Sequence, residues 1–259
     1  MITYPILEQF DEITHFCTTR HGGVSQGNYA SFNISPFSGD SIDYQTENFN
    51  RLAQVINLPT ENIVFPYQTH GSEVIIIDGD FLKKNSYNKN QLLSGKDALV
   101  TNLPEICIGI TTADCVPLTF YDPIRKVTAV AHAGWRGTCK NIVLNTINVM
   151  LDHYECKVAD IYVVIGASIS VAAYQVGEEL YENFESAGFP VSDIFKTIDS
   201  SLHLDLWKAN QWLLLQSGIP AAQIYISGLC TYFNNEEFFS ARKLGIKSGR
   251  MLSGICIRN

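Results

Sequence analysis

The sequence predicts an α+β fold in which mixed β-sheets are flanked by helices within one layered domain spanning residues 1–259. Strand-like apolar runs and helix-period segments mix along the chain without strict alternation, which favours layered α+β packing over a doubly wound parallel sheet. Hydrophobic residues make up 46% of the chain and charged residues 17%, so a sizeable core can be buried. No repeat, low-complexity tract or linker interrupts the sequence, and its length suits one large domain.

Buried strands are predicted where short apolar runs rich in β-branched residues are bounded by Gly, Pro or polar residues. Such runs occur at residues 13–19, twice within 62–80, and at 97–101, 105–110, 116–122, within 126–138, at 161–170 and at 224–229. Residues 238–259 alternate loop and strand, with glycines as breaks. The runs are densest at residues 105–138, and we expect the chain to be organised around that stretch.

Helices are predicted where apolar side chains recur at helical spacing. These segments are residues 46–57, 140–154, 176–188 and 204–218. We expect the helix at 140–154 to be entered directly from GWRGT, and we expect Gly188 and Gly218 to end the next two. Residues 81–97 are polar and poorly periodic, which predicts a surface loop.

Charge and cysteine content restrict the classes of partner. With 18 Lys plus Arg against 26 Asp plus Glu, the formal charge of −8 disfavours binding to nucleic acid or to an anionic membrane. The N-terminus lacks a basic leader, and no run of eighteen apolar residues occurs. The seven cysteines are scattered and form no CxxC pair, which favours reduced thiols. We therefore expect a cytoplasmic protein.

Reactive side chains stand at three breaks between strand-like runs. Cys115 and His132 follow apolar runs of the central stretch, and His70 lies in QTHG between two runs. Two imidazoles and one thiolate match the donors that zinc prefers, and three protein ligands leave a fourth position open. Their spacing contains no HExxH or CxxC pattern. A buried apolar thiol and hydrogen-bonded structural histidines therefore stay as alternatives on these residues alone.

Nine strings extend this pattern along almost the whole chain. In order they are TTRHGGVS, QTHG, DALVT, TTADCVPL, AHAGWRGT, YQVGEE, DLWKAN, GLCT and SGRMLSGI. The set resembles the bacterial YfiH-type family, also called polyphenol oxidase or multicopper oxidase laccase-domain proteins and now regarded as purine nucleoside phosphorylases. ADC followed by HAGWRG is its most specific part. Relatives often read SYRRD where this chain has SARKL at residues 240–244, so the role of that loop in substrate choice is open.

The resemblance implies a YfiH-like fold and a zinc ion held by His70, Cys115 and His132. It also implies phosphorolysis of adenosine, inosine and methylthioadenosine, together with deamination of adenosine, so that purine nucleosides and phosphate are the expected partners. Arg20 of TTRHGG matches a pocket arginine and is expected to contact phosphate or ribose. The family's members imply no preference between a monomer and a small homo-oligomer.

The chemistry of those reactions is consistent with the residues. Phosphorolysis needs a positive recess for the anion and stabilisation of charge on the departing purine, for which Arg20 and Arg136 are the candidates. Deamination needs a water activated at neutral pH, which an open zinc position supplies by lowering the pKa of water to about 7. Asp97 and Asp114 are candidate substrate contacts or proton carriers, although Asp114 equally suits a strand-end cap.

Three alternatives follow from the same residues. Copper is a less favoured metal than zinc, and a true multicopper oxidase needs about ten histidines where this chain has six. A metal-free cysteine hydrolase or amidase would use Cys115 as the nucleophile and His132 or His70 as the base. A noncatalytic binding domain would use zinc for structure, in a closed four-ligand site that adds Cys230.

Overall fold

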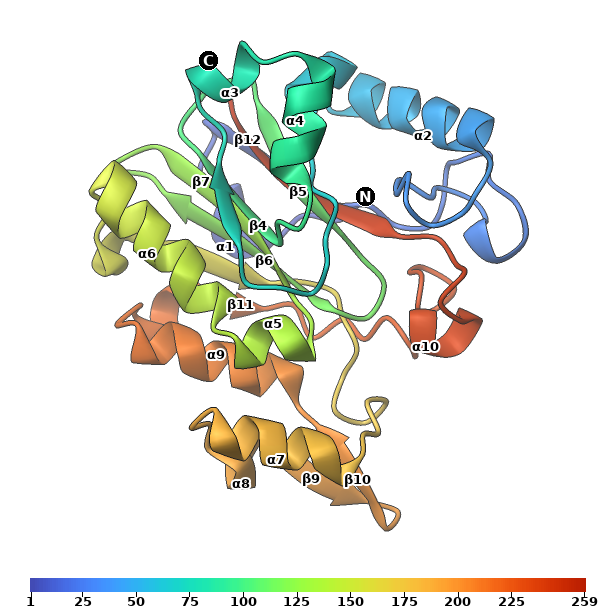
Figure 1. Ribbon diagram of the computed structural model, residues 1–259, viewed down its shortest axis with the longest axis vertical. Helices are drawn as coiled ribbons and strands as arrows, with labels where there is room; N and C mark the ends of the chain where they lie inside the picture. Colours follow the sequence, from blue (N-terminus) through green and yellow to red (C-terminus); the bar gives the residue numbers. More distant parts are fainter.

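Two facing β-sheets form the centre of the protein, whose computed structural model describes residues 1–259 (Figure 1). The larger sheet has six strands in the order β11-β8-β6-β7-β4-β3. These strands are β3 (Val74–Ile76), β4 (Ala98–Thr101), β6 (Val116–Asp122), β7 (Val127–Ala133), β8 (Tyr162–Ile165) and β11 (Ile224–Ile226). Its pairings are antiparallel except for β3 with β4 and β8 with β11, so the sheet is mixed.

The smaller sheets complete the strand inventory. A four-stranded sheet has the order β1-β12-β5-β2, and a separate hairpin pairs β9 with β10. The bounds are β1 (Ile13–Cys17), β2 (Ile63–Val64), β5 (Cys107–Thr112), β9 (Phe195–Ile198), β10 (Ser201–Leu204) and β12 (Met251–Ile257). Strand β12 contributes the last strand of the chain between β1 and β5, which ties both ends of the chain into one sheet.

The three longest helices cover the outer faces of the two sheets. The bounds of all the α-helices are α1 (Pro5–Glu8), α2 (Ile42–Val55), α3 (Gly79–Leu82), α4 (Ser86–Leu93), α5 (Trp135–Cys139), α6 (Ile142–Tyr154), α7 (Glu178–Ser186), α8 (Val191–Ile194), α9 (Leu206–Gln216) and α10 (Ala241–Leu244). Short 3₁₀ turns lie at Gly27–Tyr29, Thr60–Asn62, Val158–Asp160 and Ala221–Gln223. In Figure 1, α6 and α9 lie together on one side of the strands and α2 lies on the opposite side.

Three apolar clusters explain this layering. One lies between the six-stranded sheet and the helices that include α6 and α9, and a second fills the space between the two sheets. The third packs α2 on the outer face of the four-stranded sheet through Leu52 and Phe16. Successive side chains of β4 point to opposite faces of the sheet and so pack in two different clusters. Val100 faces the helices, and Leu99 faces the other sheet. Full burial of each such side chain stabilises the fold by about 1.5–3 kcal/mol.

The predicted α+β class with mixed sheets and flanking helices is confirmed, as are strands in every predicted run. The surface excursion predicted at residues 81–97 is mostly exposed, but it is not all loop, since α3 and α4 occupy part of it. Both helices have side-chain caps, with Asp78 accepting from the amide of Phe81 and Asn85 from that of Asn88. Helix α4 buries none of its residues, so it carries no apolar periodicity that could reveal it.

Two other boundaries differ from the sequence prediction. The helix at 140–154 is not continuous with GWRGT, because α5 ends before Asn141, whose left-handed φ of 61° separates it from α6. The β9–β10 hairpin was not predicted. Its two-residue turn, Asp199 and Ser200, has positive φ at both positions, the conformation that matches a tight hairpin. No helix has the length and apolar character needed to cross a membrane.

Candidate metal site and its cavity

His70, Cys115 and His132 converge at one edge of the sheets. His70 lies in the loop between β2 and β3, Cys115 lies between β5 and β6, and His132 lies on β7. Their ligand atoms all lie within 4.8 Å of one another. The pairing of Val116 with Ala133 and of Pro117 with His132 brings the start of β6 beside the end of β7. Cys115, which immediately precedes β6, is therefore delivered to His132.

A buried carboxylate holds both histidines. Asp97 is fully buried and accepts hydrogen bonds from the amides of Thr69, His70 and Gly71 at 3.2, 3.0 and 2.7 Å. Its Oδ1 also lies 2.8 Å from Nδ1 of His132. Asp97 therefore orients the His132 ring and the His70 loop, and the substrate contact or proton transfer expected of it from the sequence stays a prediction.

The loop that carries His70 is held in an unusual backbone conformation. His70 has a left-handed φ of 60°, which a residue without glycine's freedom adopts at a cost. Besides Asp97, Gln68 fixes this loop by exchanging hydrogen bonds with the backbone of Thr111, accepting from its amide at 2.8 Å and donating to its carbonyl at 2.9 Å. The QTHG segment thus positions an imidazole through two independent anchors.

Asp114, which precedes Cys115, joins the site to a distant segment. Its φ is 88°, and its carboxylate accepts from the Thr231 hydroxyl and from the Arg242 amide, both at 2.6 Å. The residue lines the site cavity, but both of its carboxylate oxygens already have partners within the protein. This geometry matches the strand-end capping role considered for Asp114 and leaves little of its carboxylate for a substrate.

Two glycines of HAGWRG make room for the cluster. A Cβ at Gly134 would lie 2.9 Å from Sγ of Cys115 and 3.1 Å from Cδ2 of His70, so any side chain there would displace two candidate ligands. A Cβ at Gly137 would lie 3.0 Å from the carbonyl oxygen of Gly71. The first turn of α5 can therefore approach the His70 loop only because both positions lack side chains.

The electrostatics of the cluster favour an ionised thiol. Burial alone would raise the pKa of Cys115, but the imidazoles of His132 and His70 outweigh burial and lower that pKa to about 6. Burial alone would lower the pKa of His132, but the Cys115 thiolate and the Asp97 carboxylate raise it to about 9. The protein groups by themselves thus set a thiolate beside an imidazolium.

The donor set fits a metal ion. The ligand atoms of a tetrahedral zinc site lie roughly 3.3–3.8 Å apart, given bond lengths of about 2.0–2.3 Å, so atoms within 4.8 Å of one another are in reach of a single ion after small side-chain rotations. Because Nδ1 of His132 faces Asp97, its Nε2 is the nitrogen left for the site. A carboxylate behind a metal-binding imidazole is the usual supporting arrangement in proteins.

A cavity of about 910 Å³ opens at the cluster. Its lining includes the cations Arg242, Lys247 and Arg250, and Asp114 is its only acid. Arg242 is exposed, and its guanidinium lies over the ring of Tyr174 at 5.3 Å from the centroid. Arg250 is more deeply placed, and burial lowers its pKa. In a chain of formal charge −8, this cavity is a local concentration of positive charge.

The two arginines predicted to bind the anion make other contacts. Arg20 donates from Nε to the carbonyl of Ala30 at 2.8 Å and from Nη1 to the carbonyl of Asn235 at 2.6 Å. Arg136 is exposed, with its guanidinium 4.3 Å from the centroid of the Trp135 ring. Neither arginine lines the site cavity, although Trp135 does. The predicted contact of Arg20 with phosphate or ribose and the predicted role of Arg136 in substrate binding remain predictions.

Cys230 does not join the cluster. Its Sγ accepts hydrogen bonds from Ser170, at 3.0 Å from the hydroxyl and 3.3 Å from the amide. The group of ligand atoms within 4.8 Å comprises His70, Cys115 and His132 alone. The closed four-ligand site considered for a purely structural metal is therefore not formed by Cys230.

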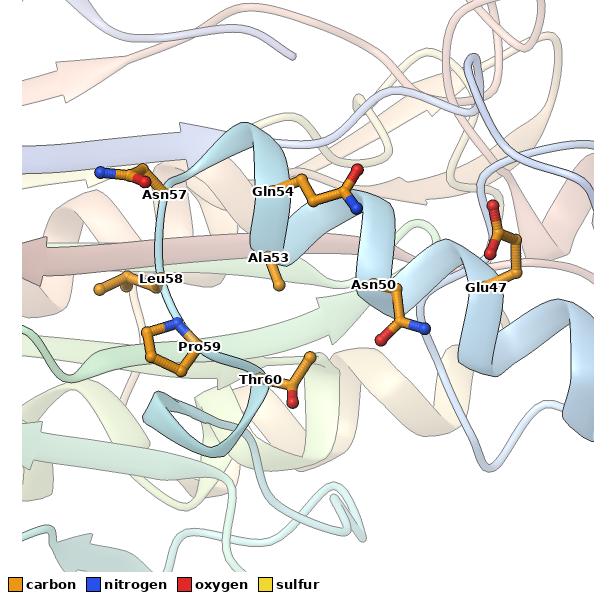
Figure 2. Close-up of a pocket in the computed structure, with 8 residues that line it drawn as sticks. All are labelled: Glu47, Asn50, Ala53, Gln54, Asn57, Leu58, Pro59 and Thr60. Atoms are coloured by element: carbon orange, nitrogen blue, oxygen red, sulfur yellow. The ribbon is translucent and has the colours of Figure 1, made fainter.

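A shallower hollow elsewhere lacks comparable chemistry. Figure 2 shows it along the last turns of α2 and the segment that follows, where the labelled side chains include three amides and the carboxylate of Glu47. Glu47 is paired with Arg51 at 2.7 Å, so this acid is already neutralised. No histidine, cysteine or cation lines this hollow, so it offers none of the groups that meet at the cavity of the candidate metal ligands.

The fold and the site together define an α+β protein with a mononuclear His-Cys-His candidate metal site at a sheet edge. The chain belongs to the family described as multi-copper polyphenol oxidoreductase laccase, whose model matches residues 14–258. This finding confirms the resemblance to the YfiH-type family.

Individual relatives are similar over nearly their full lengths. A purine nucleoside phosphorylase of Bacteroides thetaiotaomicron is 44% identical over 259 residues, covering 99% of this chain and 96% of the relative. Adenosine deaminase RL5, from an unknown prokaryotic organism, is 36% identical, covering 93% and 92%. Among solved structures, the hypothetical protein YfiH of Bacillus licheniformis matches with a TM-score of 0.90 at 30% identity, covering 97% of this chain and 95% of that one.

Several residues of the site could not be identified from the sequence. Gln68 appears in the sequence analysis only as part of the QTHG motif. Its hydrogen bond to Thr111 could not be predicted, because the two residues are 43 positions apart in the chain. Lys247 lies in the segment for which the sequence predicts only alternating loop and strand. Arg242 lies in SARKL, where this chain departs from its relatives. Only the fold brings these cations to the cavity, because the Arg242 amide reaches Asp114 across 128 residues.

Proposed function

We propose that this protein is a zinc-dependent purine nucleoside phosphorylase that cleaves adenosine, inosine and methylthioadenosine with phosphate and also deaminates adenosine. The proposal takes residues 1–259 as one cytoplasmic catalytic unit. One observation carries it: three metal-type ligands and three cations line the same cavity of about 910 Å³. The names of the relatives, purine nucleoside phosphorylase and adenosine deaminase, support the same chemistry.

His70, Cys115 and His132 are the residues that would hold the metal. We favour zinc because two imidazoles, one thiolate and an open fourth position suit it, although copper also accepts these donors. When bound, zinc would supply a Lewis acid and would lower the pKa of water to about 7. Asp97 keeps the His132 ring in the tautomer that presents Nε2 to the cavity, and it also fixes the loop of His70.

The cations would hold the phosphate and stabilise negative charge in the cavity. Arg242 and Lys247 are exposed at its wall, where their side chains can reach an incoming anion. Arg250 donates to the carbonyls of Ser248, Gly249 and Ile246, so it stiffens the segment and adds positive potential from behind. Positive charge fixed in advance lowers the energy of the transition state, in which the purine leaves with the bond electrons.

Aromatic and hydroxyl side chains offer contacts for the nucleoside itself. Phe37, Tyr67, Trp135 and Tyr174 line the cavity and provide faces against which a purine can stack. The hydroxyl of Thr112 is buried without a hydrogen-bond partner, and Thr112 also lines the cavity. An unpaired buried hydroxyl is costly, so a ligand that bonds to it would gain affinity.

The decisive experiment is a product assay on protein of measured metal content. Adenosine, inosine and methylthioadenosine are incubated with and without phosphate, and products are separated by chromatography. We expect free base and the corresponding ribose 1-phosphate only when phosphate is present, and inosine from adenosine even without it. Absence of free base in metal-replete protein would rule out the phosphorylase, and absence of inosine would rule out the deaminase.

A cysteine hydrolase is the second candidate, and one observation favours it. The neighbouring imidazoles lower the pKa of Cys115 to about 6 against the effect of burial, and such a thiolate is a competent nucleophile. That function would persist after metal removal, and a covalent Cys115 adduct would appear in mass spectra after a rapid quench. The phosphorylase proposal requires instead that activity and metal be lost together.

A further inference from the structure

A second cavity, of about 650 Å³, adjoins the metal cavity and has a different character. It lies among β2, α4 and the turn at residues 36–37, and five aromatic side chains line it: Phe37, Phe49, Phe65, Tyr67 and Phe81. We call it the aromatic cavity. Its size is in the range of about 300–1,000 Å³ typical of small-molecule sites, and apolar walls with a few polar groups are typical of them too.

The aromatic cavity and the metal cavity share a wall. Phe37 and Tyr67 line both, and their rings contact edge to face at a centroid distance of 4.8 Å. Phe37 is 53% exposed and Tyr67 47% exposed, so the fold leaves two large aromatic side chains largely uncovered. Uncovered apolar surface that lines a hollow is a common mark of a binding site.

One unpaired cation stands at the aromatic cavity. Lys89 projects from α4, is only partly exposed, and has its Nζ 5.8 Å from the centroid of the Phe81 ring. It belongs to no ion pair, whereas Lys83 pairs with Asp80 and Lys96 with Glu73. The acid on the same lining, Glu61, is exposed and accepts from the Thr60 hydroxyl at 3.4 Å. Glu61 is likewise in no ion pair, but it is exposed, whereas Lys89 is partly buried beside the Phe81 ring, so Lys89 is the charge that a ligand inside the cavity would meet.

We propose that the aromatic cavity binds a small aromatic molecule that carries one anionic group. The aromatic walls receive the ring, and Lys89 pairs with the charge. This site is separate from the metal ligands and goes beyond the proposed function. The shared wall adds a consequence, because Tyr67 lies three residues before His70 and its backbone is held by Leu93 and Gly95. A ligand on Tyr67 alters the wall that a nucleoside would contact, and so changes the apparent KM.

The test measures binding directly, with the intact protein and two fluorescent dyes. One is anilinonaphthalene sulfonate, an aromatic anion, and the other is the same anilinonaphthalene without its sulfonate. We expect saturable binding of the anion with one site per chain. Lys89→Ala should weaken it about five-fold, the upper range for a partly exposed ion pair, and should leave the uncharged dye unaffected. The matched control Lys84→Ala, at an exposed position outside the cavity, should change neither.

A second variant tests the location. Asn90 lines the aromatic cavity from an exposed position on α4, so Asn90→Trp fills the space without disturbing the core. We expect it to abolish binding of both dyes while the melting temperature stays unchanged. Arg242→Ala, which removes a cation of the metal cavity, should leave dye binding intact. Unchanged binding in both Lys89→Ala and Asn90→Trp, or loss of binding in Arg242→Ala, would overturn the proposal.

The coupling between the aromatic cavity and the metal cavity is measured separately, by enzyme kinetics, and this measurement rests on the proposed function. If the protein is a phosphorylase, a saturating aromatic anion should change the KM for inosine in the parent protein and not in Asn90→Trp. An unchanged KM with dye bound would overturn the coupling. Dye binding without any nucleoside cleavage would support the aromatic site and count against the phosphorylase, so the two failures are distinguishable.

Discussion

Two sides of the same cavity are built in opposite ways. The candidate metal ligands His70 and His132 are held by a buried carboxylate, and Cys115 directly precedes a fully buried strand. The cations Arg242 and Lys247 instead project from exposed positions around the single turn of α10 and the segment that follows. On the ligand side, His70 and His132 both bond to the buried Asp97. On the cation side, the Arg242 side chain donates one hydrogen bond, at 3.0 Å to the carbonyl of Gln175, and the Lys247 side chain makes none.

Under the proposed function, the two sides have different tasks. A metal site needs donors fixed to within fractions of an ångström, so its supporting hydrogen bonds are inside the core. Anion capture depends on charge that acts over several ångströms and tolerates motion. Changes on the ligand side should therefore abolish activity through loss of metal, and changes on the cation side should weaken substrate binding while the metal stays.

Cys115→Ser carries the largest expected effect. A serine hydroxyl is a poor zinc donor, so we expect metal and activity to fall together by more than about 100-fold, beyond the range seen when supporting residues are changed. Elemental analysis and the phosphorolysis assay measure the two losses. The parent protein should resist alkylation at Cys115 until a chelator removes the metal. Ready alkylation before chelation, with metal retained in Cys115→Ser, would instead identify a nucleophile.

Asp97→Asn comes next. The amide keeps the shape but loses the charge that holds His132 and part of the acceptor capacity that binds the His70 loop, so metal affinity should fall about 10–100-fold. Competition with a chelator measures this affinity. The KM for phosphate, assayed with saturating metal, should stay near that of the parent. If metal affinity stayed unchanged, the ligand side would not depend on its carboxylate.

Arg242→Ala tests the other side of the comparison. Removal of a charged hydrogen-bond donor should raise the KM for phosphate about ten-fold, equivalent to about 1.4 kcal/mol, and should leave metal content unchanged. Lys243→Ala is the matched control, because Lys243 is adjacent but lies over Tyr232, with its Nζ 4.7 Å from the ring centroid, and does not line the cavity. Equal effects of the two substitutions would show that general charge, not position, matters.

Arg20→Ala should have the smallest effect on catalysis. Its guanidinium bonds to the carbonyls of Ala30 and Asn235, so its loss should reduce the free energy of unfolding by about 1.5 kcal/mol. Thermal melting detects this change. The KM for phosphate should shift less than in Arg242→Ala. A larger shift in KM than in Arg242→Ala would restore Arg20 to the anion-binding role that the TTRHGG motif predicts.

The fold was largely predictable because its strands are buried on both faces. Strands β6 and β7 bury every residue, so they appear in the sequence as continuous apolar runs. Helix α4 escaped because it buries nothing and depends on the Asn85 cap. Hairpin β9–β10 escaped because its strands are short and partly exposed. The spacing of apolar residues in a sequence reflects which side chains are buried. A helix or strand outside the core can therefore be recognised only from its capping or turn residues.

The candidate site was also only partly predictable from the sequence. The three candidate ligands stand at strand breaks with the donor types of zinc, and family motifs contain them. Asp97 was named as a substrate contact or proton carrier, but its hydrogen bond to His132 was not predicted, because burial and the direction of hydrogen bonds depend on tertiary structure. The cations of the cavity were mostly missed, since Arg20 and Arg242 look alike in a sequence. Only the fold separates them. Arg20 donates to the carbonyls of Ala30 and Asn235 away from the cavity, whereas the Arg242 side chain lines the cavity and donates to the carbonyl of Gln175 alone.

The carboxylate of Asp114 has a consequence for how this protein can diversify. It fastens the segment after Ser240 to the strand end next to Cys115 through the Arg242 amide, a bond that any residue except proline can make at that position. The side chains beyond that anchor are thus free to vary without a change in where the segment sits. SARKL in place of SYRRD is one such exchange. Grafting this segment from one relative into another should transfer the preference for the anion and leave the candidate metal site unchanged.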